Sequence, residues 1–199
     1  MRPIPTAPSL IIALCALLLA PNVFAAPTLT CPPGTSARGK AGQSQYCVKP
    51  NGRRHGPAAL WQADGKLVAK TIYKNGAKTT YLRYHRNGKM QLRVRYRSGI
   101  LNGPWESWYT HGTRSARGVY KKGLLEGRFT LYHFSGVPSE TGVYRHNVRE
   151  GLWTFFHKNG KKAVMGHYVN GVRDGAWTDY DEKGSKTREL HYTQGRLKP

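Results

Sequence analysis

The chain has 199 residues, with 32 lysines and arginines against 10 aspartates and glutamates, and a formal net charge of +22. Its hydrophobic content of 39% argues against a disordered basic tail, which lacks the apolar surface that offsets chain entropy. A mean hydropathy of −0.59 with one short apolar run excludes a multi-span membrane protein, and the charge favours an anionic partner.

Residues 1–25 have the pattern of a secretory signal peptide. Arg2 supplies a positive start, residues 10–20 are all apolar, and small residues precede the expected cleavage site. An uncleaved membrane anchor is the alternative, but the apolar stretch falls well short of the ~20 residues that span a bilayer. The sequence therefore predicts export to the periplasm or the extracellular space, with cleavage after about Ala25.

Residues 26–53 contain the two cysteines that remain after cleavage, Cys31 and Cys47. A pair of cysteines in an exported chain is expected to form a disulfide, because the compartment is oxidising. The sequence has no Cys-x-x-Cys pair for redox chemistry and too few further ligands for a zinc site. The bridge is therefore predicted to be structural, and the segment to cap the first unit of the repeat array that follows.

Residues 54–199 are periodic, with six units of about 24 residues. The units are aligned on glycines that we call anchors: Gly65, Gly88, Gly112, Gly136, Gly160 and Gly184. Tyrosine stands eight residues after every anchor, at Tyr73, Tyr96, Tyr120, Tyr144, Tyr168 and Tyr192. An aromatic residue stands four before every anchor, at Trp61, Tyr84, Trp108, Tyr132, Phe156 and Tyr180, and three units add Trp105, Trp153 and Trp177 seven before it.

Each unit is predicted to contain two strands and two turns. The anchors mark one turn, and a second column, with Gly171 in one unit and Asn147 as its single exception, marks the other. Both residue types tolerate the positive φ that tight hairpin turns require. We therefore expect an all-β, elongated single-layer antiparallel sheet of about six stacked hairpins, or about twelve strands. The aromatic columns are expected to form core ladders, with a ligand platform as the alternative for the tryptophans.

The unit Gly151-Leu152-Trp153, followed by Asn159-Gly160-Lys161 and by Tyr168 to Gly171, resembles MORN (membrane occupation and recognition nexus) repeats of the bacterial variant type. The resemblance runs from about residue 54 to 195. It implies β-hairpin repeats that serve as a binding or assembly module. Some bacterial members of this family are labelled antitoxin or immunity proteins, whereas this sequence departs from a cytosolic antitoxin in its signal peptide and its charge.

Catalytic and metal-binding patterns are not evident in the sequence. His85, His133 and His157 share one repeat column, but equivalent positions in stacked hairpins would lie ~10 Å apart, too far for a shared metal ion. The acidic residues form no pair suited to glycoside hydrolysis, and no nucleophile elbow or phosphate-binding loop is present. We therefore expect a protein that is not an enzyme, with no cofactor and no metal.

Positive charge is the remaining functional signal. Residues 65–105 contain no acid and hold ten candidate anion-binding residues, Lys66, Lys70, Lys74, Lys78, Arg83, Arg86, Lys89, Arg93, Arg95 and Arg97. Strand alternation would place Arg93, Arg95 and Arg97 on one face. The sequence predicts peripheral association with an anionic envelope component, such as a lipid headgroup, lipopolysaccharide or a wall polymer. A protein partner, as for an immunity or secretion-accessory protein, is the alternative, nucleic acid is disfavoured, and the oligomeric state stays open.

Overall fold

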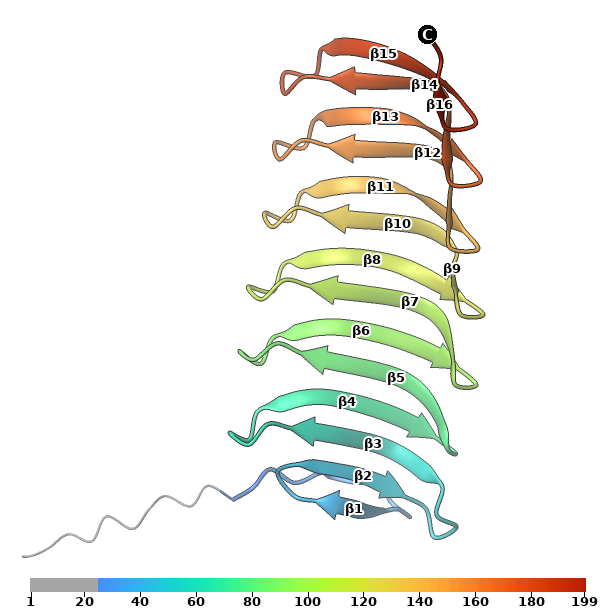
Figure 1. The fold of residues 1–199 in the computed structure, drawn as a ribbon. Coiled ribbons are helices and arrows are strands. Elements are labelled where there is room, and N and C mark those ends of the chain that lie inside the picture. The colour runs from blue at the N-terminus through green and yellow to red at the C-terminus, as the bar shows by residue number, and fades with distance from the viewer. Residues whose placement is uncertain (1–24) are drawn as a thin grey trace, which may run out of the picture.

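The computed structural model describes residues 25–199, which form one antiparallel sheet of 16 strands (Figure 1). The predicted signal peptide lies outside the described residues, apart from Ala25. The strands are, in chain order, β1 (Ser36–Lys40), β2 (Ser44–Val48), β3 (Arg54–Trp61), β4 (Leu67–Lys74), β5 (Ala77–Tyr84), β6 (Met90–Arg97), β7 (Ile100–Trp108), β8 (Arg114–Lys121), β9 (Leu124–Leu125), β10 (Gly127–Tyr132), β11 (Pro138–Arg145), β12 (Val148–Phe156), β13 (Lys162–Val169), β14 (Val172–Tyr180), β15 (Lys186–Thr193) and β16 (Arg196–Leu197).

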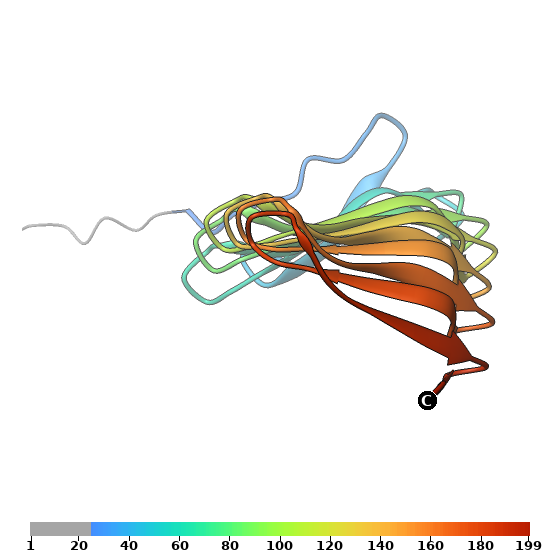
Figure 2. The same ribbon diagram turned by 90° about the horizontal axis from the view of Figure 1, so that it is seen from above.

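Strands that follow one another in the chain are neighbours in the sheet, except that β8 pairs with both β9 and β10. The six expected hairpins are β3 to β8 and β10 to β15, so the predicted all-β repeat architecture is confirmed. Four further strands, β1, β2, β9 and β16, extend it. Figure 2 looks along the stack and shows each hairpin rotated relative to the one before, as the right-handed twist of strands requires. Within residues 25–199 no helix has the length and apolar character needed to cross a membrane.

The two turn columns adopt the backbone geometry expected of them. All six anchor glycines have positive φ, from 79° at Gly65 to 103° at Gly112. In the other turn both central residues have positive φ, for example Asn170 at 50° and Gly171 at 83°. This is the pattern of a two-residue type I′ turn, whose twist matches that of the strands. Asn147, which replaces glycine in this column, adopts a φ of 70°. Asparagine can occupy this position because it tolerates the left-handed conformation that the turn requires.

The sheet has two different faces. We call one the aromatic face, which carries Trp105, Phe129, Trp153, Trp177 and the tyrosine column, and the opposite one the basic face. On the aromatic face Trp153 and Trp177 are 0% and 1% exposed, and Tyr168 lies between them with edge-on ring contacts of 6.0 and 5.0 Å between centroids. Contacts of this kind continue from Trp105 to Tyr192, so the tyrosine column and the residues seven before the anchors form a ladder along the last four units. Within residues 25–199 the aromatic residues four before the anchors make no ring contact with this ladder. One sheet without a covering layer thus obtains its core from side chains stacked along its length.

Glycine lies under the largest aromatic rings. Gly142 and Gly166 have ordinary negative φ, but a Cβ at either position would lie 2.2 Å from a ring atom of Trp153 or 2.3 Å from one of Trp177. In the register, Gly166 faces Trp153 on one side and Trp177 on the other. The absence of a side chain at these two glycines therefore lets the indoles of Trp153 and Trp177 pack directly against the backbone.

Replacing Gly166 with alanine is expected to destabilise the protein by about 1–3 kcal/mol, because the added methyl group displaces the Trp177 ring. The free energy of unfolding in urea measures the effect. The matched control is Ala176→Gly on the neighbouring strand β14, where Ala176 is exposed on the basic face opposite His191, and it should change the free energy of unfolding by no more than about 1 kcal/mol. A Gly166→Ala variant as stable as the wild type would show that the ring does not require this glycine.

The amino-terminal segment continues the sheet as well as capping it. Cys31 and Cys47 form the predicted disulfide, and Cys47 is 1% exposed. Strand β2 pairs with β3 through contacts such as Tyr46 with Ala58, and β1 forms the outermost strand beyond it. The disulfide therefore ties the chain before β1 to the second strand of the sheet.

Candidate anion-binding surface

The ten candidate bases of residues 65–105 do not form one patch. Alternation along the paired strands puts Lys70, Lys74, Arg93, Arg95 and Arg97 on the basic face. Lys78 and Arg83 lie on the aromatic face, opposite Tyr73 and Ala69. The remaining three, Lys66, Arg86 and Lys89, are in loops after β3 and β5. The three arginines of β6 share one face as expected, but the acid-free stretch as a whole divides among three surfaces.

Several of these bases are engaged within the protein. Lys66 pairs with Asp64 at 3.2 Å, and Lys89 donates from Nζ to the carbonyl of His111 at 2.6 Å. Arg93 pairs with Glu106, which also accepts from Arg114 at 2.8 Å. Burial opposes ionisation of the Glu106 carboxyl, but the hydrogen bonds and charges of the two arginines outweigh it and hold its pKa below the usual value. These three bases are therefore less available to an external anion.

The basic face extends beyond the predicted stretch. Arg117, Lys121, Arg128 and Arg145 lie on it, in β8, β10 and β11, and all four are exposed. Sequence reasoning missed them because it searched for a continuous run without acids. The repeat alignment contains the signal, since lysine or arginine stands nine residues after four successive anchors, at Lys74, Arg97, Lys121 and Arg145.

We call Lys74, Arg97, Lys121 and Arg145, all of which are exposed, the turn-edge row. Each is the last residue before a type I′ turn, so the row runs along the edge of the sheet that Figure 1 shows on the right. Equivalent residues of successive units are separated by two strands, or ~10 Å. No ion pair within residues 25–199 involves any of the four. The row is thus a ladder of free positive charge along one edge.

An apolar side chain faces each of the last three bases across its turn. The pairs are Arg97 with Ile100, Lys121 with Leu124, and Arg145 with Val148. These apolar side chains are 55%, 36% and 39% exposed. Ile100 and Val148 also lie close to the next turn, since a Cβ at Gly123 would be 3.7 Å from Ile100 Cγ2 and one at Gly171 would be 2.9 Å from Val148 Cγ1. The edge therefore offers charge and apolar surface side by side.

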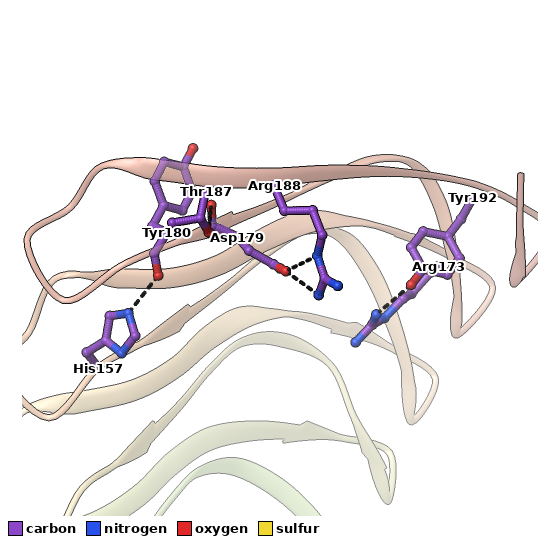
Figure 3. Close-up of polar contacts among 7 residues, drawn as sticks. All are labelled: His157, Arg173, Asp179, Tyr180, Thr187, Arg188 and Tyr192. Carbon is purple, nitrogen blue, oxygen red and sulfur yellow. Dashed lines mark hydrogen bonds and ion pairs between the residues drawn. The ribbon is translucent and has the colours of Figure 1, made fainter. Parts of the chain in front are cut away.

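The opposite edge is occupied by contacts between units. His157 Nε2 lies 2.8 Å from the carbonyl oxygen of Tyr180 in the following unit, as Figure 3 shows. His85 and His133 make the same contact with Trp108 and Phe156. A carbonyl oxygen can only accept, so Nε2 of each ring carries the proton. These histidines therefore do not gather into one site. Each forms a hydrogen bond that links its unit to the next.

The Asn-Gly-Lys sequence has a similar structural role. Asn159 donates from its amide to the carbonyl of Glu182 at 2.8 Å and accepts from the backbone N–H of Lys161 at 2.9 Å. Lys161 Nζ donates to the carbonyl of Lys183 at 2.8 Å. The motif therefore closes its own turn and bonds to the next one.

Most acidic residues of the later units are also engaged. Glu126, Glu150 and Asp174 accept from backbone N–H groups of the following type I′ turn, at 3.0 to 3.2 Å. Asp179 accepts two hydrogen bonds from Arg188, at 2.8 and 2.6 Å (Figure 3). Among residues 25–199 no three or more His, Cys, Asp or Glu side chains gather into a metal-binding group. The acids mainly balance charge and cap turns.

Two arginines cover the aromatic face. Arg149 and Arg173 lie 4.2 and 4.3 Å from the ring centroids of Trp153 and Trp177, and Arg173 donates to the hydroxyl of Tyr192 at 3.1 Å (Figure 3). Burial would lower the pKa of the Arg149 guanidinium, but hydrogen bonds to tyrosines and the charge of Glu140 outweigh burial and raise it. These two charges are part of the core and are not free for a ligand.

Comparison with known proteins agrees with the repeat pattern. The MORN repeat variant family matches residues 149–170, which confirms the predicted resemblance in this unit. No curated protein matches the chain.

Two solved structures are similar in part. One contains accessory secretory proteins 1, 2 and 3 of Streptococcus pneumoniae, with 12% identity and a TM-score of 0.36 over 52% of this chain and 20% of that one. The other is a GtfA/B complex bound to UDP and GlcNAc, with 10% identity and a TM-score of 0.22 over 82% of this chain and 25% of that one. This chain thus spans a small part of both, and likeness at this level does not bear on function.

Proposed function

We propose that this is an exported, non-catalytic binding protein that docks its basic face on an anionic surface of the cell envelope. The MORN repeat variant suggests a binding or assembly module. The observation that carries the finer proposal is the turn-edge row, Lys74, Arg97, Lys121 and Arg145, which is exposed and free of carboxylate partners within residues 25–199. Its bases are spaced along a stiff sheet, so several can meet one extended anionic surface at once.

A membrane surface is the anionic component that the edge fits best. Each basic residue near a negatively charged bilayer contributes about 1 kcal/mol, and the neighbouring Ile100, Leu124 and Val148 offer apolar contact at the headgroup boundary. Lipopolysaccharide shares this combination of anionic groups and acyl chains, whereas a wall polymer supplies the charge alone. The signal peptide pattern of residues 1–25 supports a location where these components occur.

The test is co-sedimentation of the mature protein with vesicles that contain an anionic lipid. Replacing Arg97, Lys121 and Arg145 with glutamine should weaken binding about 100-fold, because about 3 kcal/mol of attraction is removed. The matched control replaces Lys78, Arg83 and Arg86 with glutamine, which removes the same charge from other surfaces and should leave most of the affinity. Binding of the wild type should also fall as salt is raised. Equal losses in the two triple variants would mean that net charge, and not this edge, attracts the vesicle.

A protein partner, as for an immunity or secretion-accessory protein, is the second candidate. Exposed apolar side chains next to the type I′ turns favour this candidate. Ile100, Val148 and Val172 are 55%, 39% and 44% exposed and lie in successive or nearby units. Such a complex would survive high salt, because apolar contact is not screened. A pull-down from an envelope fraction at high salt that recovers one protein in stoichiometric amount would favour this candidate over the membrane.

A further inference from the structure

The basic face contains a cavity of about 740 Å³ in the middle of the array. It lies over β7, β8, β10, β11 and β12, separate from the turn-edge row. Its volume falls within the range of about 300–1,000 Å³ typical of small-molecule sites. The side chains that line it come from alternating positions of five adjacent strands, so they form two rows across the sheet.

One row is apolar except at its centre. In sheet order it consists of Pro104, Val119, Arg128, Val143 and Leu152. Val119 and Leu152 are 39% and 46% exposed, so this apolar surface faces solvent. On β6, the strand next to Pro104, this row continues with the charged Arg95, so the apolar part of the row ends at Pro104 on this side.

The second row is polar. It consists of Glu106, Arg117, Thr130, Thr141 and Thr154, which the register places opposite one another in that order. Arg93 and Arg114 already neutralise Glu106. Arg117 and Arg128 make no ion pair within residues 25–199. They lie on the neighbouring strands β8 and β10, so the cavity holds two uncompensated positive charges at its centre.

We propose that this cavity binds a single-chain anionic amphiphile, with the anionic head at Arg117 and Arg128. The chain extends over Val143 and Leu152, because the lining residues beside them are the uncharged Thr141 and Thr154. Glu150, opposite Val143 in the register, is not among the lining residues, and its carboxylate accepts from the backbone N–H of Asn170 in the next turn. Toward β7 the chain would instead pass Glu106 and Arg95, whose charges disfavour it. Guanidinium groups bind carboxylate and phosphate heads through paired hydrogen bonds.

An acidic polypeptide fits the same surface less well. The five strands are paired with neighbours on both sides, so their backbone groups are already bonded and cannot add another strand. A segment crossing the face would leave its own N–H and C=O groups without partners over the apolar row. An acyl chain has no such groups and requires only apolar contact.

Calorimetric titration with monomeric dodecanoate, below its micelle concentration, tests the proposal on the mature protein. The expected result is saturable binding of one molecule per chain. Octanoate should bind at least tenfold more weakly, since it buries fewer methylene groups, and uncharged dodecyl maltoside at least tenfold more weakly, since it lacks the anion. The double variant Arg117→Gln, Arg128→Gln should lose at least tenfold in affinity for dodecanoate.

The variant Leu152→Asp should also bind dodecanoate at least tenfold more weakly than the wild type. Leu60→Asp is its matched control. Leu60 is 45% exposed, like Leu152, but lies on the aromatic face, so its variant should bind within twofold of the wild type. If Leu152→Asp fails to fold by circular dichroism, Leu152→Ser replaces it with a smaller expected loss of at least threefold. The proposal is overturned by the absence of saturable dodecanoate binding, by equal binding of dodecyl maltoside, or by equal losses at positions 60 and 152. Saturable binding of polyglutamate without dodecanoate binding would assign the cavity to a protein segment and overturn it as well.

Discussion

Trp153→Ala is expected to destabilise the protein by about 3–5 kcal/mol, because the indole is 0% exposed and its loss leaves a cavity in the aromatic ladder. The ring contacts Phe129, Tyr144 and Tyr168, and Arg149 packs over its face. Guanidinium unfolding followed by far-ultraviolet circular dichroism measures the change. Because each unit contacts only its neighbours, the variant is also expected to unfold in two steps, with one transition on each side of the interrupted ladder.

Leu152→Ala is the control for this experiment. Leu152 precedes Trp153 in β12 but lies on the basic face and is 46% exposed, so its truncation should cost no more than about 1 kcal/mol. Similar losses in the two variants would contradict the assignment of the core to the aromatic face.

Removal of the disulfide, by Cys31→Ser together with Cys47→Ser, is expected to cost about 3 kcal/mol, because the bridge closes a loop across a sequence separation of 16 residues. The loss should be local. Strands β1 and β2 lie at one end of the sheet, so their amides should exchange with solvent faster while those of β12 to β14 stay protected. Hydrogen exchange with mass spectrometry resolves the two regions.

Reductant provides the internal control for this prediction. It should accelerate exchange in β1 and β2 of the wild type and leave the double variant unchanged, since that variant has no bridge to break. Wild-type protein whose exchange does not respond to complete reduction would show that pairing of β2 with β3 holds the end of the sheet without the bridge.

The repeat architecture could be predicted because its determinants are local and recur in register. The anchor glycines and the tyrosine column fix turns and strand phase in every unit, and stacking follows since one hairpin cannot bury its aromatics alone. The strands β1 and β2 could not be predicted in the same way. Their segment has little apolar content, and they form by pairing with the edge that β3 offers, which no local pattern in residues 26–53 encodes.

The candidate surface was predicted less completely than the fold. A run without acids identified Arg95 and Arg97 but also included Lys78 and Arg83, which the alternation of neighbouring strands sends to the other face. Arg128 and Arg145 were missed, because the charge of a sheet face is distributed by column and not by stretch. Contacts such as that of Lys89 with the next unit depend on where a long side chain finds a carbonyl group, which the repeat spacing alone does not specify.

The contacts at the ends of the strands opposite the turn-edge row run from each unit to the one that follows it in the chain. His85, Asn87 and Lys89 each bond to the backbone of the unit that follows, and His157, Asn159 and Lys161 do the same later in the chain. The second to fifth units each make at least one such contact with the unit that follows, so these side-chain contacts all run in the same direction along the chain. Duplication of a 24-residue period such as that of His157, Asn159 and Lys161 would preserve their contacts and lengthen the sheet by ~10 Å. The number of units therefore sets the length of the sheet, and with it the length of any surface that the basic face can contact at once.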